Sequence, residues 1–308
     1  GVATFTVRQN EYGQREVGDL VTNPDPSFVG KQINKVLFFR NRIVFLSESN
    51  VITSRPGSAG KPDFFIETAL TVSASDPIDI SSASMFPSEL FDGIEVSTGL
   101  VVFSTNQQFL LSADDTVLNP DTAKLRSIST FNYNKNIPPI SLGTTISYID
   151  NSGKFSRLNE MANIRREGEP SVVEVSKVIP TTLAKNIDLL TNSRENSIIL
   201  TGKTGSNIVI GYKYFQVAEN RQQAAWFKWK FNNPLLYHFI RDDEYVFLDS
   251  NYFLQKIKLV QDDDPSVVDE NEINYLLHLD NNTTIASGQF SATTNTTTFS
   301  NVGWLNNV

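Results

Sequence analysis

The chain of 308 residues contains no cysteine and only two histidines, His238 and His278. Without cysteine, the chain cannot form disulfide bonds, thiolate nucleophiles or metal sites with cysteine ligands. Two histidines far apart in the sequence cannot complete the ligand sets that zinc sites use. No apolar run approaches the roughly 20 residues that a membrane-spanning helix requires, so we expect no membrane segment.

Basic residues are fewer than acidic ones. The chain has 26 lysines and arginines against 34 aspartates and glutamates, which gives a formal net charge of −8 and a pI of about 4.9. Because an acidic protein repels phosphate backbones overall, we expect no tight nonspecific binding to nucleic acid.

Aromatic and β-branched residues are abundant, with 21 phenylalanines and 9 tyrosines. These residue types favour strands over helices, and 40% hydrophobic residues in a chain of this length suffice for a large core. We therefore expect an all-β fold. Helix should be limited to one or two turns between Thr181 and Leu190.

The stretch from residue 28 to residue 54 predicts a three-stranded meander. Two apolar runs, Val36–Phe39 and Ile43–Leu46, flank the polar step Arg40-Asn41-Arg42. Asparagine adopts positive φ at little cost, so this step predicts a β-hairpin. A third run, Val51–Ser54, follows further turn residues. Arg40 and Arg42 would flank the hairpin tip, where they could pair with carboxylates of a neighbouring blade or of a neighbouring subunit.

Similar units recur along the chain at residues 94–112, 144–158, 196–215 and 235–259. The middle strands align on Phe45, Phe103, Tyr148, Leu200 and Phe247, spaced by roughly 45 to 58 residues. This period is typical of propeller blades with four strands each. The sequence predicts a closed β-propeller of five or six blades, with a β-sandwich as the competing interpretation. In the aromatic strand at residues 224–231, Trp226 and Trp229 should lie on opposite faces.

We divide the chain into an amino-terminal strand and linker (1–27), the β-propeller (28–260), and an acidic linker with an additional partial β module at the C-terminal end (261–308). A sixth blade could combine the amino-terminal strand with residues near Ile273–Leu279.

Paired carboxylates are the main sign of an enzyme, because glycosidases work with two of them and occur on propellers. The candidates are Asp76 with Asp79, Asp114 with Asp115, and Asp242 to Glu244, and the turn Asp150–Phe155 is similar to the Asp-box turn of sialidase-type propellers.

Adjacent acids in turns are usually only solvated. His238 lies close to Asp242 and Asp243 in sequence, but no nucleophile signature accompanies it. We expect no catalytic, cofactor-binding or metal-binding residues, and no cofactor.

Three further motifs have plain structural explanations. Gly202-Lys203-Thr204-Gly205 lacks the upstream glycine spacing of a phosphate loop and predicts a hairpin turn. Asp262–Asp264 lacks the alternating oxygen ligands of an EF-hand. The sequons at Asn281, Asn282 and Asn295 lie in a tract rich in asparagine and threonine, where they arise by chance.

Five segments, in order, resemble the nozzle family (tail tubular protein B) of short-tailed podophages. They are GDLVTNPDPSFVG (18–30), LFFRNRIVFLSESNVITSRPG (37–57), SASDPIDI (73–80), RQQAAWFKWKF (221–231) and NYFLQKIKL (251–259). The resemblance covers most of residues 18–260 and thins after Glu272. It implies a structural β-propeller with no catalytic residues, and a family protein that extends beyond this chain at both ends.

The resemblance also implies partners and a location. A member of this family would form a homo-hexamer in the virion tail, dock on the tail adaptor protein and help to anchor tail fibres. Double-stranded DNA would pass through it without tight binding, and assembly would take place in the host cytoplasm. The alternative from another class is a carbohydrate-binding or glycoside-hydrolysing β-propeller.

Overall fold

The computed structural model describes residues 4, 6, 16–57, 62–84, 87–113, 117–217, 220–259 and 290–297. The chain divides into two compact units, Gly1–Leu259 and Val260–Val308. The predicted all-β fold is confirmed: the described part of the first unit consists of antiparallel sheets and one short helical turn.

The first sheet begins with the predicted hairpin. Strands β1 (Lys35–Phe39) and β2 (Arg42–Ser47) pair so that Phe39 lies opposite Arg42. Arg40 and Asn41 have φ of 47° and 62°, as a two-residue turn that follows the twist of its strands requires. Strand β3 (Asn50–Thr53) continues the meander as expected, and β4 (Ile78–Ser81) adds a fourth strand after a long connection.

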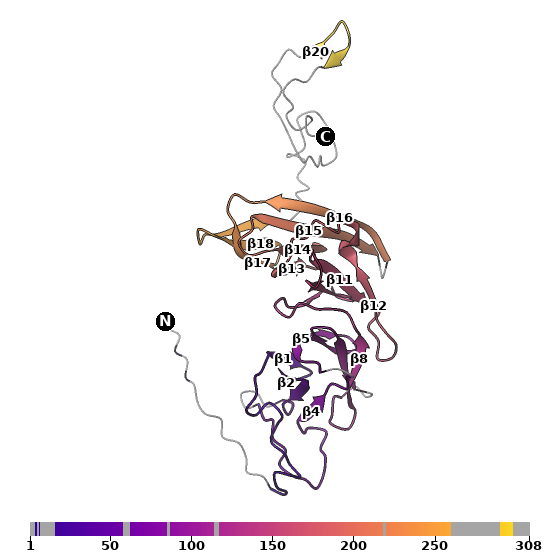
Figure 1. Ribbon diagram of the computed structural model, residues 1–308, viewed down its shortest axis with the longest axis vertical. Helices are drawn as coiled ribbons and strands as arrows, with labels where there is room; N and C mark the ends of the chain where they lie inside the picture. Colours follow the sequence, from indigo (N-terminus) through magenta and orange to yellow (C-terminus); the bar gives the residue numbers. More distant parts are fainter. Residues whose placement is uncertain are drawn as a thin grey trace. The chain divides into compact units, whose positions relative to one another are not determined.

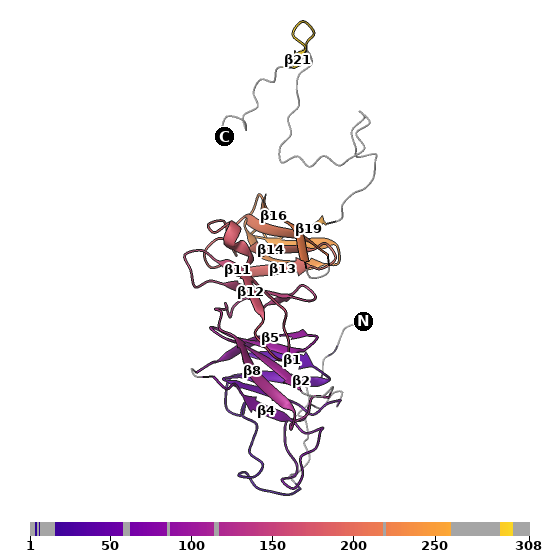
Figure 2. The ribbon, with the colours of Figure 1, turned by 90° about the vertical axis from the view of Figure 1, so that its right-hand side faces the viewer.

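Four more sheets follow in chain order, and each is a meander of consecutive strands (Figures 1 and 2). The second contains β5 (Leu90–Val96), β6 (Gly99–Ser104), β7 (Gln108–Ala113) and β8 (Ala123–Ser129). The third contains β9 (Ile140–Ser141), β10 (Ile146–Asp150), β11 (Arg157–Ala162) and β12 (Ser171–Glu174). The fourth contains β13 (Leu189–Ser193), β14 (Ile198–Gly202), β15 (Ile208–Val217) and β16 (Asn220–Lys230). The fifth contains β17 (Leu235–Arg241), β18 (Glu244–Asp249) and β19 (Leu254–Lys258).

The aligned anchor residues all fall on the second strand of their sheets. Phe45, Phe103, Tyr148, Leu200 and Phe247 lie on β2, β6, β10, β14 and β18. A second strand has neighbours on both edges and covered faces, so its sequence is the most continuously apolar of the blade. The period of the middle strands is therefore the period of the sheets.

Consecutive sheets pack face to face. One hydrophobic core joins the first and second sheets, and three more join the second to the third, the third to the fourth, and the fourth to the fifth. Trp226 belongs to the third of these cores and Trp229 to the fourth, which confirms that they lie on opposite faces of β16. The first strand β13 lies next to both β9 and β17, and β1 lies next to β5.

Meander sheets that pack in chain order with their first strands adjacent are the blades of a β-propeller. The predicted propeller is confirmed, with five blades among the described residues. None of the four cores contains residues of both the first and the fifth sheet, so the described residues do not show the closed ring that the sequence predicted.

Helix is confined to a 3₁₀ turn, η1 (Val175–Val178), among the residues that the structure describes. The turn expected between Thr181 and Leu190 is not helical, since β13 already begins at Leu189. No helix in the described part of the chain is long and apolar enough to cross a membrane.

The second unit contributes a short hairpin, β20 (Phe290–Ser291) with β21 (Thr296–Thr297). It is the described part of the expected C-terminal β module. Residues 273–279 and most of 3–8, from which a sixth blade was expected, lie outside the described residues.

Candidate functional site

The carboxylates of the first blade hold loops together. Asp76 is 7% exposed, accepts the Ser73 N–H at 2.7 Å and lies 3.3 Å from the Arg55 guanidinium. Asp79 accepts the Ser27 N–H at 2.7 Å and the Asn50 amide at 2.9 Å. Each carboxylate already accepts hydrogen bonds from loop residues or from the start of β3, as structural carboxylates do.

The other described candidate acids lie in turns or at the strand ends beside them. Asp150 caps its turn by accepting the Ser152 N–H at 2.7 Å, and Arg157 lies 3.6 Å away. Asp242 has a φ of 53° at the tip of the β17–β18 hairpin, and Asp243 accepts the Asn196 amide at 3.0 Å. Asp114 and Asp115 lie outside the described residues, as do His278, Asn281, Asn282 and Asp262–Asp264.

Arg42 is the largest fully buried side chain among the described residues. The expectation that it pairs with a carboxylate is wrong. Its guanidinium donates to four backbone carbonyls, those of Ser54, Ala74, Asp76 and Leu118, at 2.7–3.2 Å. Burial lowers the pKa of Arg42, and the charge of Asp76 partly offsets this. The side chain ties the hairpin to two connections that lack secondary structure of their own.

An ion pair joins the third and fourth blades. Arg221 on β16 donates two hydrogen bonds to Glu160 on β11, at 2.7 and 3.0 Å, and a third to the Tyr212 hydroxyl at 3.0 Å. Its guanidinium also lies 4.5 Å from the centre of the Tyr214 ring. Burial alone would lower the pKa of Arg221, but the bonds and charge of Glu160 raise it. This bidentate pair fixes the register between two blades.

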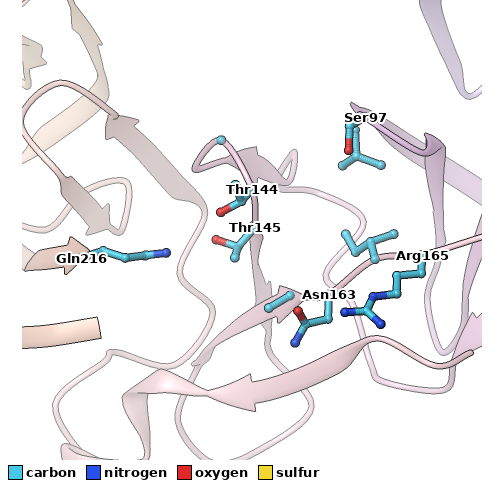
Figure 3. A pocket seen from close by; sticks show the side chains of 10 residues that line it. Ser97, Thr144, Thr145, Asn163, Arg165 and Gln216 are labelled. Atoms are coloured by element: carbon cyan, nitrogen blue, oxygen red, sulfur yellow. The ribbon is translucent and has the colours of Figure 1, made fainter. Parts of the chain in front are cut away.

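A cavity of about 480 Å³ opens where residues of the second, third and fourth blades meet (Figure 3). Its polar lining includes Ser97, Thr145, Asn163, Arg165 and Gln216. No aspartate, glutamate or histidine lines it. Such a cavity can hydrogen-bond a polar or anionic group, but its lining offers no general acid or base near neutral pH.

His238 is a core residue of the fifth blade. It is 3% exposed, and its Nδ1 lies 2.9 Å from the Tyr245 hydroxyl. Burial lowers the pKa of His238 to about 4, although the charge of Asp188 opposes the shift. The ring is therefore neutral at pH 7. No serine or cysteine nucleophile contacts it among the described residues.

We expect stability to fall as the pH drops from about 6.5 to about 4, in part because of His238. The unfolded chain takes up a proton near pH 6.5, whereas the folded protein resists protonation down to about 4. Between these two pH values, His238 alone should lower the free energy of unfolding by about 3 kcal/mol. Urea denaturation at pH 7 and pH 4 should show a smaller loss in the His238→Phe variant. Equal losses in both proteins would contradict the assignment.

The Gly202–Gly205 motif and the sequon at Asn295 are parts of turns. Lys203 and Ser206 close the predicted turn through a backbone hydrogen bond of 2.9 Å, with Gly205 at φ 80°. Asn295, at φ 47°, lies in the turn between β20 and β21. Within the described ranges, no group of three or more acidic or histidine side chains could hold a metal ion.

Comparison with known proteins gives one sequence relative and several structures. The tail tubular protein gp12 of Escherichia phage T7 is 27% identical over 264 residues, which cover 83% of this chain and 33% of that protein. The chain thus spans about a third of the length of this relative. The Kluyveromyces lactis Hsv2 structure has a TM-score of 0.46 at 9% identity and covers 75% of this chain and 62% of that chain. The structure of BamB from Moraxella catarrhalis has a TM-score of 0.42 at 12% identity, and it covers 73% of this chain and 58% of that chain.

A family model extends the sequence relationship to almost the whole chain. It is described as bacteriophage nozzle protein, and it matches residues 1–306. This match includes all five blades and the β20–β21 hairpin. The chain therefore belongs to the bacteriophage nozzle protein family.

Proposed function

We propose that this chain is the propeller-bearing part of a structural subunit at the distal end of a phage tail. In the virion six copies would form a ring around the exit channel, dock on the tail adaptor protein and help to anchor the tail fibres. Assembly would take place in the host cytoplasm. The family match over residues 1–306 is the observation that carries this proposal.

The fold supports a mechanical role. Four hydrophobic cores and the Arg221–Glu160 pair couple the blades in series, so a load on one blade passes to its neighbours through packed side chains. We propose residues 28–260 as the propeller domain, preceded by a linker (1–27) and followed by an acidic linker with a partial β module (261–308).

Electron microscopy of the intact protein tests the ring. Two-dimensional class averages should show six-fold symmetry with an open centre. A population of single particles at micromolar concentration, with no ring in virion tails either, would overturn the proposal.

We further propose that the chain has no catalytic, cofactor-binding or metal-binding residues. Asp150 and Asp243 accept hydrogen bonds from Ser152 and Asn196, and the cavity of about 480 Å³ has no aspartate, glutamate or histidine in its lining. Incubation with bacterial surface polysaccharide should release no reducing sugar. Release that disappears in Asp150→Asn or Asp243→Asn would instead support the glycoside-hydrolysing alternative.

We expect the chain to bind duplex DNA no more tightly than about 1 μM at physiological salt. Acidic residues outnumber basic ones by 34 to 26, and runs such as Asp242-Asp243-Glu244 repel a backbone within about 8 Å. A conduit that held phosphates firmly would slow the passage of the genome. Filter binding measures the dissociation constant for duplex DNA directly. A constant below about 1 μM would show that the protein binds the DNA tightly.

A further inference from the structure

The cavity of about 480 Å³ is lined by polar side chains that take no part in holding the fold together. Thr145 is 8% exposed, yet its hydroxyl forms no hydrogen bond with a described residue. The side chains of Ser97, Thr144, Asn163 and Arg165 also lack hydrogen bonds and ion pairs to described residues. Buried polar groups normally have a partner, from the protein or from water. These five side chains are therefore free to contact a bound molecule.

The second blade fixes the backbone that carries Asn163 and Arg165. Both residues lie in the connection between β11 and β12. The Thr98 hydroxyl donates to the carbonyl of Ile164 at 3.3 Å. The Arg126 guanidinium donates to the carbonyl of Arg165, also at 3.3 Å. The cavity is therefore formed before a ligand arrives, as small-molecule sites usually are.

Arg165 is the only charged residue in the cavity lining. Glu160, close to the lining in sequence, is already bound by Arg221. Three exposed glutamates that are also close in sequence do not line the cavity: Glu95, Glu167 and Glu169. They offset the positive charge at a distance, so only a group in contact with the guanidinium benefits from it. This arrangement fits a ligand with a single oxyanion, held by charge-assisted hydrogen bonds.

The rest of the lining is neutral and suits a molecule with several hydroxyl groups. Serine and threonine hydroxyls and the asparagine amide can each donate and accept hydrogen bonds. In Figure 3 the Gln216 amide and the Arg165 guanidinium point inward from opposite sides, with Thr145 between them. Val96 and Ile164 add apolar surface. An inorganic anion would leave most of these groups unused, whereas a sugar ring offers both hydroxyl groups and C–H surface to them.

We propose that this cavity binds a sugar that carries one carboxylate, of the uronic acid class. The carboxylate lies on Arg165, and the ring hydroxyls bond to Thr145 and Asn163. The sugar is bound without being cleaved, because no general acid or base lines the cavity. One contacting charge and a few neutral hydrogen bonds give a dissociation constant of about 1 mM. The proposal does not rest on the ring or on a position in the tail.

Ligand-observed NMR titration of the 308-residue chain with sodium glucuronate is the measurement. Glucose has the same ring without the carboxylate, and acetate is the carboxylate without the ring. Each offers only half of the proposed contacts, so both should bind at least about tenfold more weakly than glucuronate.

Two variants separate the charged contact from the neutral ones. Arg165→Gln should weaken glucuronate binding about tenfold or more and leave glucose binding unchanged. Thr145→Val keeps the side-chain size, and it should weaken binding of both sugars severalfold. Arg166→Gln is the matched control, because Arg166 is the next residue, is exposed and does not line the cavity. It should bind glucuronate as the parent does.

Both binding variants should keep the thermal unfolding midpoint within a few degrees of the parent, because Arg165 is exposed and valine fills the space of threonine. A loss of binding is then not a loss of fold. Absence of saturable glucuronate binding up to about 20 mM overturns the proposal. Equal binding of acetate and glucuronate also overturns it, since the cavity would then recognise only a carboxylate, such as an acidic side chain of another protein. An unchanged affinity in Arg165→Gln would place the sugar elsewhere. None of these results bears on the six-fold ring, which micrographs test separately.

Discussion

Replacing Arg42 with methionine should destabilise the protein by about 3 kcal/mol, even though it removes a buried charge. The guanidinium satisfies four backbone carbonyls that have been taken out of water, and each unsatisfied buried acceptor costs roughly 1–3 kcal/mol. Relief from burying the cation offsets part of this loss. The methionine fills the space but offers no donor. Urea denaturation at pH 7 measures the change.

Arg126→Met is the matched control. Arg126 also donates to three backbone carbonyls, those of Arg165, Arg166 and Gly168, but it is only half-buried. Water can replace its bonds, so the loss should stay below about 1 kcal/mol. Equal losses for the two arginines would mean that burial is not what makes Arg42 important.

Replacing Gly99 with alanine should cost at least about 3 kcal/mol, the upper range for forcing an extra atom into a packed site. A Cβ at this position would lie 2.2 Å from the carbonyl oxygen of Leu111 on the neighbouring strand. That oxygen belongs to the β6–β7 pairing, so it cannot swing aside as a side chain could. The centre of the second blade would have to separate. The shift of the denaturation midpoint measures the effect.

Gly202→Ala provides the comparison at another strand glycine. The nearest atoms to a Cβ there are 3.5 and 3.6 Å away, in His238 and Leu189, which is ordinary contact. We expect a change of less than about 1 kcal/mol. If Gly99→Ala were as well tolerated as Gly202→Ala, strand β6 would not lie as close to β7 as described.

Much of the fold follows from local sequence patterns. The turn at Arg40-Asn41, the anchor residues of the second strands and the opposite faces of Trp226 and Trp229 all depend on residues near one another in the chain. Strands β4, β8 and β12 were harder to predict, because they are short or half-exposed fourth strands after connections of variable length. Their pairing depends on the sheet already formed, so their own sequence carries little signal.

The polar contacts between distant segments could not be predicted in the same way. Glu160 and Arg221 are 61 residues apart, and only the packing of the third blade on the fourth brings them together. Arg42 was expected beside the hairpin tip, paired with a carboxylate. The sequence does not show that the backbone carbonyls of residues 74, 76 and 118 come within hydrogen-bonding distance of its guanidinium. An isolated arginine in a turn gives no sign that its acceptors will be carbonyls.

The pH dependence assigned to His238 could not be predicted from the sequence either. In the sequence it is a histidine close to two aspartates, and nothing there shows that its ring is buried. In the fold its surroundings are the core between two blades, and burial lowers the pKa of His238 to about 4. The strand register around β17 and β18 turns it inward, while Asp242 and Asp243 lie in and beside the hairpin turn.

Cryo-electron microscopy of virions of the phage that encodes this chain tests the central claim most directly. Fitting the five-blade array of residues 28–259 into the density should place six copies around the channel at the distal end of the tail. The same array found at another position in the particle, or six-fold tail density that cannot hold five consecutive blades, would contradict the account.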